Sequence, residues 1–212
     1  MATLEQELEN TALALDIPDE QFRRVHGLLE QLKARDAPTR DHSIRVGLLG
    51  VKVAQYIPDA SPNLMFYSGT LHDIGKIKVD PRSLKKTHDF GPKDMKEVKK
   101  HVMFSYEILK NIYPCSAEVV VRHHLPNGYP EELPELSIQV CQTTRAMIYS
   151  HARLLSLVDS YDAASTRKNN KHGEECNLLT PKEVRQIMIS ENQDQVQLIE
   201  ELYDVHIFGQ QD

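Results

Sequence analysis

The nine residues from Leu71 to Val79 read LHDIGKIKV and place a histidine beside an aspartate near the end of a predicted helix. Ser61 and Pro62 have the residue types of an N-cap and a first helical position, and Gly75 is a residue type that commonly ends a helix. His72 and Asp73 should therefore lie on helical backbone, where neighbouring side chains diverge by about 100°. Two such side chains cannot approach one point from the same side, but the two carboxylate oxygens of Asp73 would let it contact two partners while His72 contacts one.

Apolar residues recur at helical spacing on both sides of this segment, whereas β-branched residues are scattered without alternation. The pattern predicts an all-α fold, with the first two helices over about residues 4–15 and 19–33. A third helix is capped by Thr39 and carries His42. Two further helices run from Gly91-Pro92 through His101 to before Pro114, and through His151 to Asp162. Thr180 to Glu183 form a capping box, and Leu125 to Pro130 form a turn or loop. We expect residues 1–35 to be a short N-terminal helical extension and residues 36–212 to be the catalytic domain.

The composition indicates a globular, cytoplasmic protein. The 212 residues are 40% hydrophobic and 26% charged, which is typical of a globular domain. The polar, acidic start MATLEQELEN and the lack of a long apolar run predict a cytoplasmic protein without a membrane partner. The cysteines Cys115, Cys141 and Cys176 form no C-x-x-C pair, so we expect them to be reduced and structural.

The net charge of −6 is unevenly distributed and disfavours binding to a nucleic-acid polymer. From Lys76 to Lys100 the chain has nine Lys/Arg and four Asp/Glu, so this stretch carries +5 and the remainder −11. Such a run is often only a solvated helix face. Its functional interpretation is attraction of a small, phosphate-rich substrate toward a site beside Lys76.

Nitrogen and carboxylate donors recur along the chain in numbers that could surround two divalent ions. A single histidine is weak evidence, because one imidazole has many ways to form hydrogen bonds. The whole set contains no thiolate, which favours a catalytic site over structural zinc. The predicted metal ligands are His42, His72, Asp73, His101, His123, His124 and Asp159.

The order of these motifs resembles the HD phosphohydrolase superfamily, and within it the HD-GYP subfamily, from about Asp36 to the C-terminus. The matching segments are RDAPTRDHSIRV, LHDIGKIKV, MKEVKKHVMFSYEIL, HHLPNGYP and LLSLVDSYDAAST. The resemblance implies a core of about five or more helices whose inner ends converge on the metal ions.

The resemblance also implies roles for individual residues. One metal ion would be held by His42, His72, Asp73 and Asp159, and the other by Asp73, His101, His123 and His124. Lys76 would contact a substrate phosphate. Arg167 matches an arginine that follows the last aspartate of the family pattern, and its two interpretations are a residue that faces the substrate and one that is simply solvated. Gly128, Tyr129 and Pro130 match the Gly-Tyr-Pro motif on the substrate side, although Asn-Gly is also ordinary turn chemistry.

Two departures from the family pattern bear on metal number and substrate. Members with three metal ions have a glutamate one turn before the first histidine, but this chain has Pro38 there, so we expect two ions. Only Leu125, Pro126 and Asn127 separate the histidine pair from Gly-Tyr-Pro, which is shorter than in the family. Asp162 is either an outer acceptor for a ligand histidine or a helix-capping or solvated residue, and His26, His88, His151, His172 and His206 are expected to be structural or on the surface.

The predicted activity is metal-dependent phosphohydrolysis. Two cations bridged by Asp73 would lower the pKa of a shared water to about 7, supplying hydroxide for attack on phosphorus. By resemblance, the substrate is a cyclic dinucleotide such as cyclic di-GMP. The alternatives are a nucleotidase or other phosphomonoesterase, a di-iron oxygenase, and a non-catalytic regulatory module. The ligand types suit Fe, Mn, Co, Ni and Zn alike, and the sequence is compatible with a homodimer.

Overall fold

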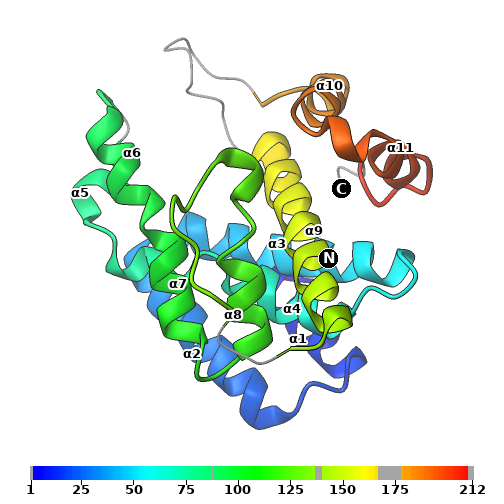
Figure 1. The fold of residues 1–212 in the computed structure, drawn as a ribbon, viewed down its shortest axis with the longest axis horizontal. Coiled ribbons are helices and arrows are strands. Elements are labelled where there is room, and N and C mark those ends of the chain that lie inside the picture. The colour runs from blue at the N-terminus through cyan, green and yellow to red at the C-terminus, as the bar shows by residue number, and fades with distance from the viewer. Residues whose placement is uncertain (1, 87, 137–139, 167–177, 210–212) are drawn as a thin grey trace. The chain divides into compact units, whose positions relative to one another are not determined.

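The computed structural model describes residues 2–86, 88–136, 140–166 and 178–209. Within these ranges every regular element is a helix, which confirms the all-α prediction (Figure 1). The chain divides into two compact units, Met1–Ser156 and Leu157–Asp212. The predicted division at residue 35 stays a prediction.

The first unit contains most of the helices. They are α1 (Leu4–Ala14), α2 (Asp19–Arg35), α3 (Ala37–Tyr56), α4 (Pro62–Leu71), the 3-10 helix η1 (Ile74–Lys78), α5 (Pro81–Leu84), α6 (Pro92–Lys99), α7 (His101–Leu109), α8 (Pro114–Val120) and the 3-10 helix η2 (Leu125–Asn127). Helix α9 (Gln142–Thr166) begins in this unit and continues into the second. The second unit also contains α10 (Pro181–Glu191), the 3-10 helix η3 (Gln193–Gln195) and α11 (Val196–Asp204).

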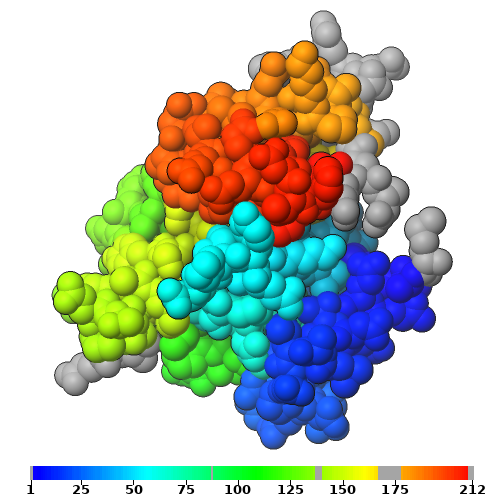
Figure 2. All heavy atoms as spheres, turned by 90° about the vertical axis from the view of Figure 1, so that its right-hand side faces the viewer, coloured from blue at the N-terminus to red at the C-terminus, as the bar shows by residue number. Residues whose placement is uncertain are grey.

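Helices α3 and α4 pack closely together in the first unit because glycines meet at their crossing. A Cβ atom added to Gly69 would lie 2.6 Å from the Cα atom of Gly47, which is closer than two carbon atoms can approach. Helices α1 and α2 pack on α3, and Figure 2 shows their blue surface bordering the cyan surface where α3 ends and α4 begins. The close crossing of α3 and α4 brings together two elements that carry predicted ligands.

Two helix ends differ from the sequence-based prediction. Helix α3 begins at Ala37 with Asp36 as its N-cap, because the Asp36 side chain accepts a hydrogen bond from the Thr39 N–H; Thr39 itself lies inside the helix. Helix α4 has the predicted Ser61 cap and Pro62 but ends at Leu71 rather than at Gly75. The chain then tightens into η1, where the Lys76 N–H donates to the Asp73 carbonyl at 2.9 Å.

The helix predicted to run from Gly91-Pro92 through His101 is interrupted. The Lys100 N–H donates to the Glu97 carbonyl, three residues earlier, at 3.2 Å, which replaces α-helical bonding with a tighter turn. Helix α6 therefore ends at Lys99, and α7 starts at His101. This break places His101 at the beginning of a helix rather than in its interior.

The second unit has a small core of its own. The predicted capping box at Thr180 is present, and Arg185 of α10 forms an ion pair with Glu200 of α11. The rings of Tyr161 and Phe208 stack with their centroids 3.9 Å apart, and the Gly209 N–H donates to the Tyr161 hydroxyl at 2.7 Å. Across both units, the described residues include no helix with the length and apolar character that a membrane crossing requires.

Candidate metal centre

Asp73 is a buried carboxylate of the first unit that faces three buried histidines. Its Oδ2 atom is 3.5 Å from Nε2 of His72 and 3.9 Å from Nε2 of His42, while its Oδ1 atom is 3.3 Å from Nε2 of His101. All four residues are at most 3% exposed. One carboxylate thus faces histidines from α3, from the end of α4 and from the start of α7.

The end of α4 explains how His72 and Asp73 both face this point. The expectation that their side chains diverge as on a continuous helix is wrong, because α4 ends at Leu71 and Asp73 has left helical geometry, with φ −94° and ψ 4°. The Ser105 hydroxyl donates to the His72 carbonyl at 2.7 Å and accepts from the Gly75 N–H at 2.8 Å. Ser105 of α7 therefore holds the turn in place.

Gly75 permits this close approach between η1 and α7. A Cβ atom at this position would lie 2.0 Å from the His101 carbonyl oxygen and 2.5 Å from the Ser105 nitrogen, and both are backbone atoms. Since backbone cannot rotate out of the way as a side chain can, any side chain here would push η1 away from α7. Gly75 thus acts by close packing rather than as the predicted end of α4.

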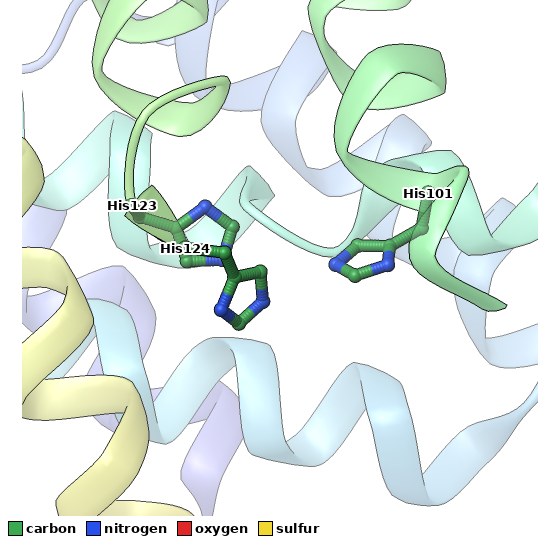
Figure 3. A group of neighbouring side chains, drawn as sticks. All are labelled: His101, His123 and His124. Carbon is green, nitrogen blue, oxygen red and sulfur yellow. The ribbon is translucent and has the colours of Figure 1, made fainter. Parts of the chain in front are cut away.

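His101, His123 and His124 form a second group beside Asp73. One ring nitrogen from each lies within 4.8 Å of the others, and Figure 3 shows the ring of His101 pointing toward those of the histidine pair. His123 and His124 lie on the turn between α8 and η2, with ring centroids 3.8 Å apart. Nitrogen atoms at these separations can reach a common ion.

Three of the histidines are each oriented by the main-chain carbonyl three residues earlier in the chain. The Nδ1 atoms of His72 and His101 lie 2.8 Å from the Gly69 carbonyl and 2.7 Å from the Val98 carbonyl, and Nδ1 of His123 contacts the Val120 carbonyl at 2.5 Å. A carbonyl can only accept, so Nδ1 carries the proton and Nε2 presents its lone pair. This arrangement is typical of histidines that bind metal through Nε2.

The electrostatics keep the donors in their metal-binding forms. Burial would raise the pKa of Asp73, but the Lys76 ammonium and the surrounding imidazoles lower it well below its usual range. Burial lowers the pKa of His101 to about 4, although Asp73 opposes this effect. His101 is therefore neutral at pH 7, and the Lys76 ammonium, whose Nζ lies 2.6 Å from Asp73 Oδ2, stabilises the carboxylate.

The residues present fit divalent metal ions. Buried, neutral imidazoles with a defined lone pair and an ionised carboxylate are the donor set that such ions require. Nε2 of His101 is buried and makes no hydrogen bond within the described residues, although it faces Asp73.

The other predicted site residues are placed as follows. Asp159 is partly exposed and lies on the part of α9 that belongs to the second unit. Gly128 has a left-handed backbone with φ 75°, and the Tyr129 ring lies against His124 with centroids 4.4 Å apart. Pro130 follows Tyr129 through a cis peptide bond. Arg167 lies outside the described residues.

The histidines expected to be structural or on the surface are placed separately from this group where they are described. His151 is buried; its Nδ1 contacts the Met147 carbonyl at 2.8 Å, and its Nε2 accepts from the Ser61 N–H at 2.8 Å. Both ring nitrogens of His151 thus form hydrogen bonds with the protein backbone. His26 faces Glu5 at 3.1 Å.

Sequence reasoning missed three residues that support the site. Ser105 gives no signal in the sequence, because its partners lie 30 and 33 residues away along the chain. Arg122 forms a buried ion pair with Glu118 and donates to the Pro134 carbonyl at 3.2 Å, which anchors the segment after Gly-Tyr-Pro. Asn127, which the Asn-Gly pattern assigned only to a turn, lies 3.2 Å from Nδ1 of His124.

Three curated proteins with similar sequences are named as phosphodiesterases. The chain is 28% identical over 147 residues to a Thermotoga maritima protein named cyclic di-GMP phosphodiesterase, which aligns with 65% of this chain and 37% of the relative. It is 23% identical over 172 residues to the 3'3'-cGAMP-specific phosphodiesterase 2 of Vibrio cholerae, covering 77% of this chain and 31% of the relative. A Pseudomonas aeruginosa cyclic di-GMP phosphodiesterase is 29% identical over 178 residues, covering 77% and 41%.

The chain therefore spans about a third to two fifths of the length of these relatives. The pattern of the HD domain matches residues 39–164, which is more than half of the chain and includes every predicted metal ligand. The HD domain is metal-dependent, in agreement with the buried histidine and aspartate groups described above. By this match, the chain belongs to the HD domain family.

Proposed function

We propose that this protein is a metal-dependent phosphodiesterase that opens a cyclic dinucleotide. The observation that carries the proposal is the convergence of His42, His72 and His101 on the two oxygens of Asp73, at 3.3–3.9 Å. A carboxylate between two sets of neutral imidazoles has the chemistry of a bridging ligand.

In this proposal two metal ions share Asp73. His42, His72 and Asp73 bind one ion, which Asp159 completes, and Asp73, His101, His123 and His124 bind the other. The proximity of the ring nitrogens of His101, His123 and His124 supports the second set. Pro38 offers no ligand for a third ion, which favours a two-ion site.

When bound, two divalent ions supply a nucleophile at neutral pH by lowering the pKa of water, and they offset charge on the phosphoryl oxygens. The protein itself orients the ligands and excludes water around Asp73. Lys76 contributes a cation at the edge of the site, where its ammonium can pair with a substrate phosphate as well as with Asp73. This is positioning and electrostatic stabilisation without covalent catalysis.

The substrate class rests on the relatives and on charge. The named activities of three relatives concern cyclic di-GMP or 3'3'-cGAMP, both anionic cyclic dinucleotides. Exposed lysines that form no ion pair with a described residue lie on η1, directly after α5 and on α6, at Lys78, Lys85, Lys93 and Lys96. Gly128, Tyr129, Pro130 and Arg167 are the proposed contacts to the rest of the substrate.

The proposal can be tested by chromatography of the reaction products. Protein whose metal content has been measured should convert cyclic di-GMP or 3'3'-cGAMP to the linear dinucleotide. The Asp73→Asn variant should be inactive, whereas Asp59→Asn, the same change on an exposed turn, should retain activity. Intact cyclic dinucleotide beside rapid hydrolysis of a mononucleotide would instead identify a phosphomonoesterase. The short link between His124 and Gly128 is the observation that favours this second candidate.

A further inference from the structure

His124 differs from the other histidines of its group in the residue that faces its Nδ1 atom. His101 and His123 each direct Nδ1 at the main-chain carbonyl three residues earlier in the chain. Nδ1 of His124 lies instead 3.2 Å from the side-chain amide of Asn127, three residues later in the shortened loop. The group that faces Nδ1 of His124 is therefore a side chain, which a mutation can remove, rather than a main-chain carbonyl.

The loop holds Asn127 in this position through its backbone. The Asn127 N–H donates to the His124 carbonyl at 2.9 Å, and the Tyr129 N–H donates to the same oxygen at 3.3 Å. Gly128 adopts the left-handed conformation that reverses the chain, and the Tyr129 ring then covers His124. Because the link has only three residues, Asn127 cannot move far from His124 without breaking these contacts.

An amide side chain offers two kinds of group to an imidazole. As placed, the Asn127 NH2 donates to Nδ1 of His124, which leaves the ring proton on Nε2. A half-turn of the amide exchanges NH2 for oxygen, which accepts from Nδ1–H and leaves the Nε2 lone pair available. Only the second arrangement matches the form in which His72, His101 and His123 are held.

We propose that Asn127 is a positioning residue for metal binding: its side-chain oxygen accepts a hydrogen bond from Nδ1–H of His124 when Nε2 of that histidine binds a metal ion. Asn127 then has the same role toward His124 that main-chain carbonyls have toward His72, His101 and His123. This inference rests on the proposed metal centre but not on the identity of the substrate.

Metal affinity tests the proposal directly. Zinc binding should be measured by calorimetry on metal-free wild-type protein and on Asn127→Ala, Asn127→Asp and, as a control, Asn10→Ala, which alters an exposed residue of α1. Removing the oxygen should weaken the affected zinc site by about 10- to 100-fold. Asn127→Asp can only accept, so it should bind zinc at least as tightly as the wild type, and the control should be unchanged.

Two results would overturn the proposal while leaving the metal centre intact. The first is wild-type zinc affinity in Asn127→Ala. The second is an equal loss of zinc affinity in Asn127→Asp and Asn127→Ala, which would mean that the amide acts as a donor. A wild-type protein that binds no zinc would overturn both this inference and the proposed function.

The protonated nitrogen of His124 gives a second readout that does not depend on affinity. Two-bond proton–nitrogen NMR spectra of the zinc-loaded wild type should show His124 protonated at Nδ1. In Asn127→Ala this proton should exchange faster with water, because its acceptor is lost. A His124 ring protonated at Nε2 in the zinc-loaded protein would contradict the proposed role of Asn127.

Discussion

Lys76 and Asp73 form a close pair of opposite charges beside the histidines of the proposed metal centre. The Lys76 ammonium is 2.6 Å from the Asp73 carboxylate and is positioned to compensate negative charge at the metal centre. If it also stabilises the transition state, Lys76→Ala should lower kcat/KM by about 100- to 1000-fold, mainly through kcat. Lys78→Ala, an exposed neighbour on η1, is the matched control and should change kcat little. Equal effects of the two substitutions would show that Lys76 contributes only general charge.

His101 predicts how the stability of the metal-free protein depends on pH. Its folded-state pKa of about 4 lies below the ordinary value of 6.5 because the folded protein buries the ring. Between these values the unfolded chain binds a proton that the folded chain does not, so stability falls as pH decreases from 6.5 to 4. One such proton changes the free energy of unfolding by about 1.4 kcal/mol per pH unit.

Urea unfolding of chelator-treated protein at several pH values measures this dependence. His101→Leu removes the titrating group. The free energy of unfolding of this variant should therefore change less between pH 6 and pH 5 than that of the wild type, by up to about 1.4 kcal/mol. An identical pH dependence in the variant and the wild type would contradict the assigned cause.

The turn that joins α4, η1 and α7 is the structural element on which the site depends most. Gly75→Ala would place a methyl group 2.0 Å from the His101 carbonyl, so we expect a loss of about 3 kcal/mol in the free energy of unfolding. Gly27→Ala is the opposite case, because Gly27 is exposed in α2 with nothing within 4 Å of the added Cβ. It should stabilise the protein by about 0.5–1 kcal/mol. Urea unfolding of both variants tests the pair, and a neutral Gly75→Ala would refute the close-packing argument.

Helix ends were predictable from the sequence where their determinants are local. The caps at Ser61 and Thr180 follow from residues within one turn, and the structure confirms both. The end of α4 at Leu71 was not predictable, because it depends on Ser105, which contacts His72 and Gly75 from 30 or more residues away. The break at Lys100 was likewise invisible, since Lys is a favourable helix residue.

The metal centre was predictable as a set of residue types more than as a geometry. Histidines and an aspartate in a recognisable order identify donors, and the structure brings five first-unit histidines and Asp73 together in adjoining groups. The sequence could not reveal which nitrogen each histidine presents, since this depends on the carbonyls of Gly69, Val98 and Val120. The role of Asn127 could not be predicted either, because it depends on where its side-chain amide lies relative to Nδ1 of His124.

At the scale of the whole molecule, the two units divide the predicted ligands. The first unit contains all the histidines of the proposed centre and Asp73, while Asp159 belongs to the second. If Asp159 completes one metal site, Asp159→Asn should weaken binding of one ion while the site formed by His101, His123 and His124 stays occupied. Calorimetric titration with zinc measures this, and unchanged binding of both ions would exclude Asp159 as a ligand.

Metal stoichiometry tests the central claim most directly. Wild-type protein loaded with zinc or manganese and then dialysed should retain two ions per chain by elemental analysis. Asp73→Asn should retain fewer than one, because both ions lose their shared carboxylate, and the exposed Asp59→Asn control should again retain two. Circular dichroism should show equal helix content in all three proteins. Wild-type protein that retains no metal, or Asp73→Asn protein that keeps both ions, would contradict a metal centre bridged by Asp73.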